Sequence, residues 1–423
     1  MALSHSCFVY IQLPGTYSWV TCASLKITEV SAGAFVGDFI YGKRYLSRTD
    51  AVALDEVLVP LNAESMQFTK LKGVPGPIRD AAPDHWGRRV IQAKLERGEQ
   101  DLGEMDYLLN GPDDGAGNLR FGTTTTPSRT TRPFNKTRQL AELIEAAQAL
   151  QADGRLPHEV LEQLEPGTSM GGARPKVSIE EQKKIWLAKL PERDDRHNVQ
   201  RIEYATLELA RKAGLTVCGT RLEHLEGADA LMLERFDREW NPDEKAYARY
   251  ALVSGLTLLN AEDGHVDRER WSYLLMAQEL RRRSSKPQED CLEFFRRMVF
   301  NAMVTNNDDH PRNHAMLQTP QGWRLSPAYD IVPVRLMSLE RRDLALTVGK
   351  FGRTASIYNL ISQCEEFGLP KEDALAEIAR MRAIVDDWRE HYKSAGVDSD
   401  GMAMLEQAIL PPCFDFLEPI QQV

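Results

Sequence analysis

Residues 304–317 read VTNNDDHPRNHAML and directly follow a segment whose apolar residues have helical spacing. Aspartate and asparagine are also common turn residues, so an isolated cluster of this kind is typical of a solvated turn. From Asp308 to Asn313, however, the D-x-x-x-x-N spacing lets a carboxylate and an amide oxygen point into one cleft from opposite ends of a loop. A hard cation such as Mg²⁺ prefers such oxygen donors. The stretch therefore predicts a general base and a metal ligand.

A second candidate metal ligand follows in PAYDI, where Asp330 stands seventeen residues after Asn313 among apolar neighbours. A carboxylate in apolar surroundings needs a partner, and a metal ion is one way to compensate its charge. The alternatives are an aspartate that caps a helix and one that forms a salt bridge in the core.

Composition limits the class of protein. A chain of 423 residues with 42% hydrophobic and 27% charged residues predicts two or three packed globular domains. A formal net charge of −10 argues against a dominant nucleic-acid surface. The six cysteines contain no C-x-x-C pair, and no signal peptide or apolar run long enough to span a bilayer is present. We therefore expect a cytoplasmic protein without zinc, disulfides or a membrane partner.

Periodicity divides the chain into a β-rich first part and a helical last part. Residues 7–60 alternate apolar and polar positions, residues 78–109 have helical spacing, and residues 123–137 have the composition of a linker. Beyond about residue 250 nearly every segment has helical spacing, except a zone of loops and strands at 305–353. The pattern predicts an α+β fold.

The segment KIWLAKL has the pattern of a strand that ends in a candidate functional lysine. Alternation places Lys189 on one face with Ile185 and Leu187. An ammonium group on a buried face needs an anion, and the next helix offers Glu203 near its start. The alternative is an edge-strand lysine that reaches water.

The turn GTSMGGARPK, residues 167–176, precedes this strand and contains Gly171 and Gly172. Backbone amides of such glycines can line phosphate groups without obstruction by side chains, although a glycine cluster is more often a flexible turn. It is not a Walker loop, because Ala173 and Arg174 stand where that motif needs Lys and Ser or Thr.

His310 and His314 have i, i+4 spacing, but Pro311 between them disfavours a regular helix and no further ligand completes a zinc site. We interpret both as structural histidines, with His310 bracing its loop.

The order of these motifs is that of a protein-kinase-like fold, and the sequence resembles the HipA family of serine/threonine kinases, the toxins of HipBA toxin–antitoxin modules. The motifs that carry the resemblance are GTSMGGARPKVSI, WLAKLP, LMLERFDR, NNDDHPRNH, LSPAYDIVP and IRDAAPDHWGRRVI. It implies a two-lobed fold with a short N-terminal subdomain at 1–130, a β-rich kinase N-lobe at 131–240 and an all-α C-lobe at 241–423.

The resemblance also implies roles for individual residues. Asp308 is expected to be the catalytic base, and Mg²⁺ is expected to bind Asn313 and Asp330. Lys189, partnered by Glu203, is expected to contact the ATP phosphates. Further ATP contacts are expected at Ser169, Gly171, Gly172, Lys176, Glu234, Arg235, Phe236 and His310, with the backbone of 234–236 meeting adenine. Ser169, or the adjacent Thr168, is expected to be autophosphorylated, and Asp309 is expected to add a carboxylate at the border of the metal site.

The family implies a small HipB-like helix-turn-helix antitoxin, DNA contact only through that antitoxin, and a protein substrate in translation such as an aminoacyl-tRNA synthetase. Two alternatives stay open: a small-molecule or lipid kinase of the same fold, and a non-catalytic nucleotide-binding corepressor. A metal-dependent nuclease is disfavoured because it leaves Lys189 and the glycine turn unexplained.

Overall fold

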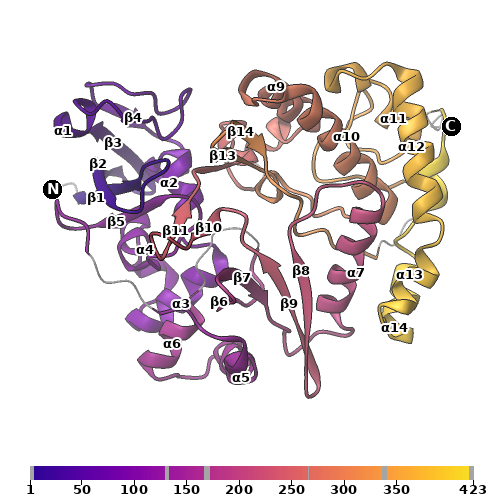
Figure 1. Cartoon of the computed structure of the whole chain (residues 1–423), viewed down its shortest axis with the longest axis horizontal. Helices are drawn as coiled ribbons and strands as arrows, with labels where there is room; N and C mark the ends of the chain where they lie inside the picture. The colour runs from indigo at the N-terminus through magenta and orange to yellow at the C-terminus, as the bar shows by residue number, and fades with distance from the viewer. Residues whose placement is uncertain (1–3, 129–132, 166–171, 265, 336–340, 419–423) are drawn as a thin grey trace. The chain divides into compact units, whose positions relative to one another are not determined.

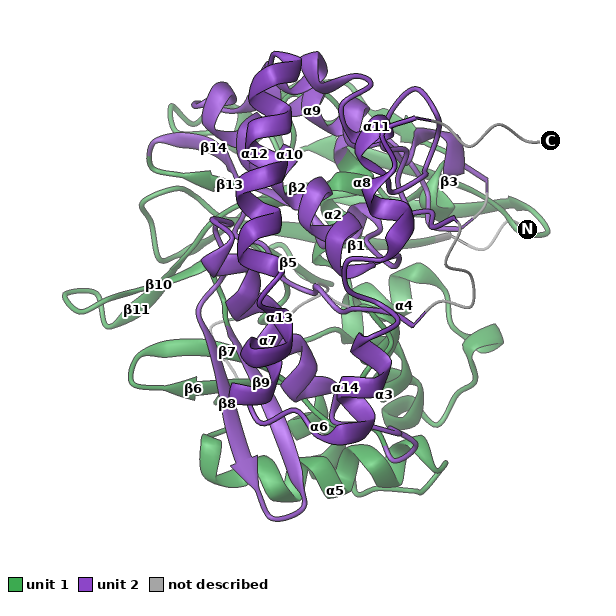
Figure 2. Cartoon of the chain, turned by 90° about the vertical axis from the view of Figure 1, so that its right-hand side faces the viewer, with its two compact units in different colours: residues 1–192, 234–257, 317–320 green, residues 193–233, 258–316, 321–423 purple. Residues whose placement is uncertain are grey.

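The computed structural model describes residues 4–128, 133–165, 172–264, 266–335 and 341–418 (Figure 1). The chain divides into two compact units (Figure 2). Unit 1 comprises residues 1–192, 234–257 and 317–320, and unit 2 comprises 193–233, 258–316 and 321–423. Thr168, Ser169 and Gly171 lie outside the described residues. The described elements confirm the predicted α+β fold: of the fourteen described strands, twelve end by residue 254 and two follow among the later helices.

Unit 1 begins with a five-stranded antiparallel sheet in the order β4-β3-β2-β1-β5. Alternate residues of its first strand, Cys7, Val9 and Ile11, are buried in one hydrophobic core, as the period-two pattern predicted. The strands are β1 (Ser4–Gln12), β2 (Trp19–Ser31), β3 (Ala34–Tyr41), β4 (Met66–Phe68) and β5 (Leu119–Gly122).

The rest of unit 1 consists of short helices and two β-hairpins. The helices are α1 (Lys43–Leu46), α2 (Gly76–Ala81), α3 (His85–Leu95), α4 (Glu104–Asn110), α5 (Leu140–Gln151) and α6 (His158–Leu164). The hairpins are β6 (Lys176–Glu181) with β7 (Lys184–Lys189), and β10 (Arg238–Asn241) with β11 (Ala246–Arg249). Strand β12 (Leu252–Ser254) follows.

Unit 1 continues across the expected domain boundary at residue 130. After that boundary, Asn135 accepts a backbone hydrogen bond from Glu180 of β6 at 2.9 Å and donates its side-chain amide to the Gln163 carbonyl at 2.7 Å. The division at residues 130 and 240 stays a prediction, whereas the compact units divide the chain after residue 192.

Unit 2 begins with α7 (Val199–Lys212), the helix expected after the lysine strand, and this helix buries Ile202, Ala205 and Leu209. Gly214 follows with a φ of 95°, a left-handed conformation that suits glycine. The hairpin of β8 (Thr220–Leu225) and β9 (Ala228–Glu234) comes next, although Glu234 itself belongs to unit 1.

Most of the remaining elements are helices. They are α8 (Gly255–Leu258), α9 (Tyr273–Arg283), α10 (Pro287–Val304), α11 (Ile357–Leu360), α12 (Lys371–Val385), α13 (Trp388–Ser394) and α14 (Ser399–Leu405). Two short strands, β13 (Ala315–Thr319) and β14 (Gly322–Leu325), occupy the predicted zone of loops and strands. The part of the chain expected to be all-α therefore contains strands as well.

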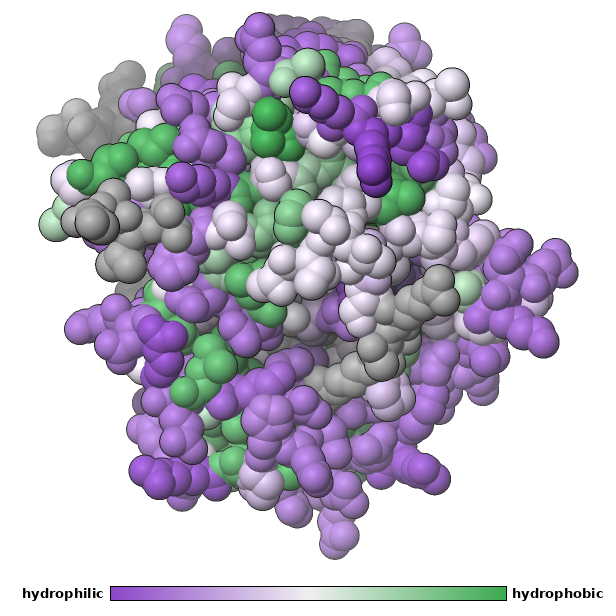
Figure 3. All heavy atoms as spheres, turned by 90° about the vertical axis from the view of Figure 1, so that its left-hand side faces the viewer, coloured by the Kyte–Doolittle hydropathy of each residue, from purple (hydrophilic) through white to green (hydrophobic). Residues whose placement is uncertain are grey.

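The exposed surface is mostly hydrophilic on the face drawn in Figure 3, where apolar side chains lie among polar ones. In the part of the chain that the structure describes, no helix combines the length and hydropathy needed to cross a membrane.

We predict that the cysteines are unreactive in the folded protein. All six lie in described segments as buried thiols. Burial raises the pKa of Cys7 to about 12 and that of Cys291 to about 11, so these thiols stay protonated at pH 8. Ellman's reagent should react slowly with the native protein and release six equivalents in denaturant. Rapid reaction of the native protein with Ellman's reagent would contradict the burial of these thiols.

Candidate active site

The loop that follows α10 is fixed to that helix by hydrogen bonds. Thr305 ends the helix in a left-handed conformation, with a φ of 55°. The backbone amide of Asn306 donates to the Asn301 carbonyl at 2.9 Å, and the two buried side chains are joined at 3.1 Å. The amide of Val334 donates to the Thr305 carbonyl at 3.1 Å. These bonds set the direction in which the loop leaves the helix.

Asp309 anchors the same loop from inside unit 2. Its carboxylate is 2% exposed. It accepts hydrogen bonds from the Tyr273 hydroxyl at the start of α9 and from the His314 ring at 2.9 Å. Burial and the nearby Asp309 charge raise the pKa of Tyr273 well above its ordinary value. Asp309 is thus held by protein donors, and the structural role predicted for His314 is confirmed.

Asp308 lies on the open side of the loop, within electrostatic range of several charged groups of unit 2. Burial raises the pKa of Asp308, and the carboxylates of Asp330 and Asp309 raise it further, while His310 and Arg268 act in the opposite direction. Asp330 has a left-handed backbone, with a φ of 59°. Asp330 therefore lies within electrostatic range of Asp308, while the shared metal site expected from the D-x-x-x-x-N and PAYDI motifs stays a prediction.

Asn313, on the same loop as Asp308, has an amide oxygen that receives no hydrogen bond from the described part of the protein. Its Nδ2 donates to the Asp308 carbonyl at 3.3 Å, whereas its Oδ1 is buried and lacks a hydrogen-bond partner among the described residues. A buried oxygen without a partner is unfavourable unless something else binds it. Two carboxylates and an amide oxygen are suitable donors for Mg²⁺. The residues present therefore fit the expected metal.

His310 and Arg268 are the two basic residues that lower the pKa of Asp308. The His310 ring packs against Trp271, with centroids 6.4 Å apart, and its backbone amide donates to the Asp308 carbonyl at 2.8 Å. Sequence reasoning missed Arg268, because an arginine forty residues before the loop carries no motif that links it to Asp308.

Lys189 ends a strand that is buried on both faces. Residues 185–189 are all buried, and Lys189 itself is 6% exposed. It stands opposite Lys176 in the β6–β7 register. Glu203 is also buried, in α7. Since Lys189 belongs to unit 1 and Glu203 to unit 2, their pairing stays a prediction, as does the meeting of Lys189 with Asp308.

Lys176 has a partner that sequence reasoning missed. Its ammonium group donates to the Asp84 carboxylate at 2.7 Å and to the Gly172 carbonyl at 2.7 Å, and it is almost completely buried. Asp84 also caps α3 by accepting from the Gly87 amide at 2.9 Å. This contact ties the end of the glycine turn to the PDHWG motif. Whether Lys176 also contacts ATP stays a prediction.

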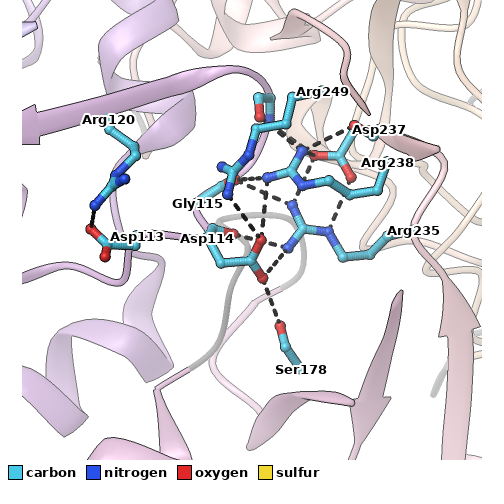
Figure 4. A network of polar contacts seen from close by, with 10 residues as sticks. Asp113, Asp114, Gly115, Arg120, Ser178, Arg235, Asp237, Arg238 and Arg249 are labelled. Carbon is cyan, nitrogen blue, oxygen red and sulfur yellow. Dashed lines mark hydrogen bonds and ion pairs between the residues drawn. The ribbon is translucent and has the colours of Figure 1, made fainter. Parts of the chain in front are cut away.

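The segment expected to meet adenine is anchored within unit 1. The backbone amide of Arg235 donates to the Ile185 carbonyl at 2.8 Å, and Lys184 pairs with Glu234 at 2.8 Å. The Arg235 guanidinium is buried against Asp114 and Asp237 (Figure 4). The Arg235 side chain is therefore structural, and the backbone contact from 234–236 to adenine stays a prediction.

The family model of the HipA-like C-terminal domain matches residues 168–388, which is more than half of the chain. Two curated relatives align with part of the chain. The serine/threonine-protein kinase toxin HipA of Shewanella oneidensis is 26% identical over 202 residues, 44% of this chain and 46% of the relative. A putative kinase of Sinorhizobium fredii is 26% identical over 155 residues, 35% of this chain and 36% of the relative. The chain thus aligns with less than half the length of these curated relatives.

A solved structure has a similar fold over nearly the whole chain. The toxin in the complex of Shewanella oneidensis HipA, HipB and operator DNA has a TM-score of 0.64 to this chain. The superposition covers 94% of both chains at 17% sequence identity. The fold is therefore the protein-kinase-like fold of that toxin.

We predict that Asp309→Ala destabilises the protein by about 2–4 kcal/mol, because the Tyr273 hydroxyl and the His314 ring would lose their buried acceptor. Urea denaturation monitored by circular dichroism measures the change.

The matched control is Asp386→Ala, since Asp386 is 54% exposed and faces Arg382 at 3.7 Å. This control should change the stability by less than about 0.5 kcal/mol. Equal stability of both variants would show that the Asp309 contacts do not hold the loop.

Proposed function

Because the chain belongs to the HipA-like C-terminal domain family, we propose that it is a serine/threonine protein kinase that uses ATP and Mg²⁺ and acts as a HipA-like toxin. The names of its relatives, a kinase toxin and a putative kinase, support this proposal. The observation that carries it is the buried, unpartnered amide oxygen of Asn313, whose Nδ2 donates to the carbonyl of the candidate base Asp308.

In the proposed mechanism, Asp308 accepts the proton of the acceptor hydroxyl as that oxygen attacks the γ-phosphorus of ATP. The bond from the γ-phosphorus to the oxygen that bridges it to the β-phosphate breaks, and ADP is the leaving group. A raised pKa suits this role, since a general base works best when its pKa approaches the working pH. Asn313 and Asp330 hold Mg²⁺, and Lys189 contacts the ATP phosphates. When bound, Mg²⁺ supplies positive charge to the phosphate oxygens. Catalysis is therefore mostly positioning and charge stabilisation.

The glycine turn is proposed to cover the ATP phosphates and to carry the regulatory site. Gly172 is exposed, and its carbonyl is bound by Lys176. A phosphate on Ser169 would add a charge of about −1.5 to −2 where ATP phosphates are expected to bind. Autophosphorylation at Ser169 would therefore oppose ATP binding and silence the kinase.

The partner and the substrate follow from the family. The related toxin was solved with HipB and operator DNA, which supports a HipB-like antitoxin for this chain and contact with DNA through that antitoxin. The proposed substrate is a protein of translation, of the aminoacyl-tRNA synthetase class. Incubating the protein with labelled ATP and a cell lysate, followed by identification of the labelled bands, tests this proposal.

We predict that Asp308→Ala lowers phosphoryl transfer by about 10²- to 10⁴-fold, the range for loss of a general base. Transfer from labelled ATP to the lysate measures the loss, and calorimetry should show that affinity for ATP is largely retained. The control Asp386→Ala, with its exposed carboxylate, should transfer phosphate at the wild-type rate. Unimpaired transfer by Asp308→Ala would contradict the role of Asp308.

We predict that Ser169→Ala abolishes autophosphorylation while transfer to other proteins continues. Intact-mass spectrometry after incubation with ATP and Mg²⁺ should find no added phosphate on this variant. Thr168→Ala is the neighbouring control and should accept phosphate as the wild type does. The reverse result would move the acceptor to Thr168, and phosphate on both variants would exclude both positions.

A further inference from the structure

Unit 1 contains a pocket of about 800 Å³ that the proposed kinase mechanism does not use. Of the residues expected to contact ATP, none that the structure describes lines this pocket. Its walls combine aromatic rings with basic side chains. The aromatic residues are Tyr17, Trp19, Phe134, Trp240 and Tyr247, and the basic residues are Lys94, Lys136, Arg238, Lys245 and Arg249.

Most of the acidic side chains of this pocket already have a basic partner. Glu165 accepts from Lys94 at 2.7 Å, and Glu180 accepts from Lys136 at 2.5 Å and from the Tyr247 hydroxyl at 2.7 Å. Both carboxylates are therefore already ion-paired with lysines of the protein. The carboxylate of Asp113 is likewise bound, by Arg120.

Three arginines and two aspartates form one network of ion pairs (Figure 4). Three of these five residues, Asp114, Arg238 and Arg249, line the pocket. The fully buried Asp237 accepts from Arg235 at 2.9 Å and from Arg238 at 2.8 Å. Asp114 accepts from Arg235 at 2.7 Å and lies 3.5 Å from Arg238. Among these five residues the guanidinium groups outnumber the carboxylates by one.

The surplus positive charge is on Arg249. Its guanidinium lies 3.7 Å from Asp114, beyond hydrogen-bond distance, and its Nη1 is buried without a hydrogen-bond partner among the described residues. It stacks against Trp19, with 4.8 Å from Cζ to the ring centroid. Burial, together with the charge of Arg238, lowers the pKa of Arg249 well below its ordinary value. Arg249 thus shares the Asp114 carboxylate with Arg235 and Arg238 and has the longest of the three contacts. A buried cation that is paired so weakly is destabilising and favours a further anion.

We propose that this pocket binds a small anionic ligand with a flat aromatic body, whose carboxylate or phosphate group pairs with Arg249. The planar guanidinium group suits an oxyanion, because it can donate two parallel hydrogen bonds. The ring of the ligand packs among Trp240, Tyr247 and Phe134, which already contact one another edge to face at 5.0 Å and 6.3 Å. The anionic group of the ligand thereby supplies the negative charge that balances the third guanidinium group of the network.

The proposal is tested on the full chain with phenyl phosphate, benzoate and inorganic phosphate as probes, using isothermal titration calorimetry. Phenyl phosphate or benzoate should bind the wild type, and the stronger of the two identifies the anionic group. Inorganic phosphate should bind more weakly than phenyl phosphate, because it lacks the ring. A saturating concentration of Mg²⁺ and a non-hydrolysable ATP analogue should leave the binding unchanged, since the ATP residues lie outside the pocket.

Arg249→Gln should bind the aromatic probes about thirtyfold more weakly or worse, as expected for loss of a buried ion-pairing partner. In the absence of ligand, the Arg249→Gln variant should be folded and at least as stable as the wild type, because the substitution removes a buried and weakly paired guanidinium charge. Arg48→Gln is the matched control, since Arg48 is 39% exposed and already pairs with Asp50, and it should bind as the wild type does.

Two results would overturn the proposal. One is that neither phenyl phosphate nor benzoate binds the wild type at millimolar concentration. The other is equal affinity of the wild type and a folded Arg249→Gln variant.

Discussion

The buried carboxylate of Asp309 is the contact on which the candidate active site depends. A charge removed from water is tolerated only with donors around it, and Tyr273 and His314 supply them. The donors come from the start of α9 and from the end of the loop itself, so one carboxylate fixes two elements. While Asp309 is held inward, the adjacent Asp308 is exposed, accepts a hydrogen bond from Asn313 at its backbone carbonyl and lies within electrostatic range of Asp330.

The same rule organises unit 1. Asp84 is buried because it caps α3 and binds Lys176, and Asp237 is buried because two guanidinium groups and the Gly117 amide surround it. Several buried side-chain polar atoms of the described residues depart from the rule, because they lack a hydrogen-bond partner in the protein. Two of these departures, the amide oxygen of Asn313 and Nη1 of Arg249, lie at candidate ligand sites. Both departures are interpreted as places for a ligand, Mg²⁺ at the first and an anion at the second.

Local patterns predicted the elements, and distant pairings could not be predicted. The alternation in residues 7–60 and the helical spacing around Leu209 are set by neighbours along the chain, so the sequence shows them directly. The D-x-x-x-x-N spacing likewise predicted that Asp308 and Asn313 share one loop. Lys176 and Asp84, in contrast, are 92 positions apart, and Arg235 and Asp114 are 121 apart. No spacing rule links such residues, because the folded chain alone brings them together.

The central claim is that Lys189, Asp308, Asn313 and Asp330 bind one Mg²⁺–ATP. A crystal structure with Mg²⁺ and a non-hydrolysable ATP analogue tests it most directly. The account predicts metal coordination by Asn313 Oδ1 and Asp330, the Lys189 ammonium group on a phosphate oxygen, and the Asp308 carboxylate facing the γ-phosphate. A nucleotide bound elsewhere, or a metal ion that contacts neither Asn313 nor Asp330, would contradict it.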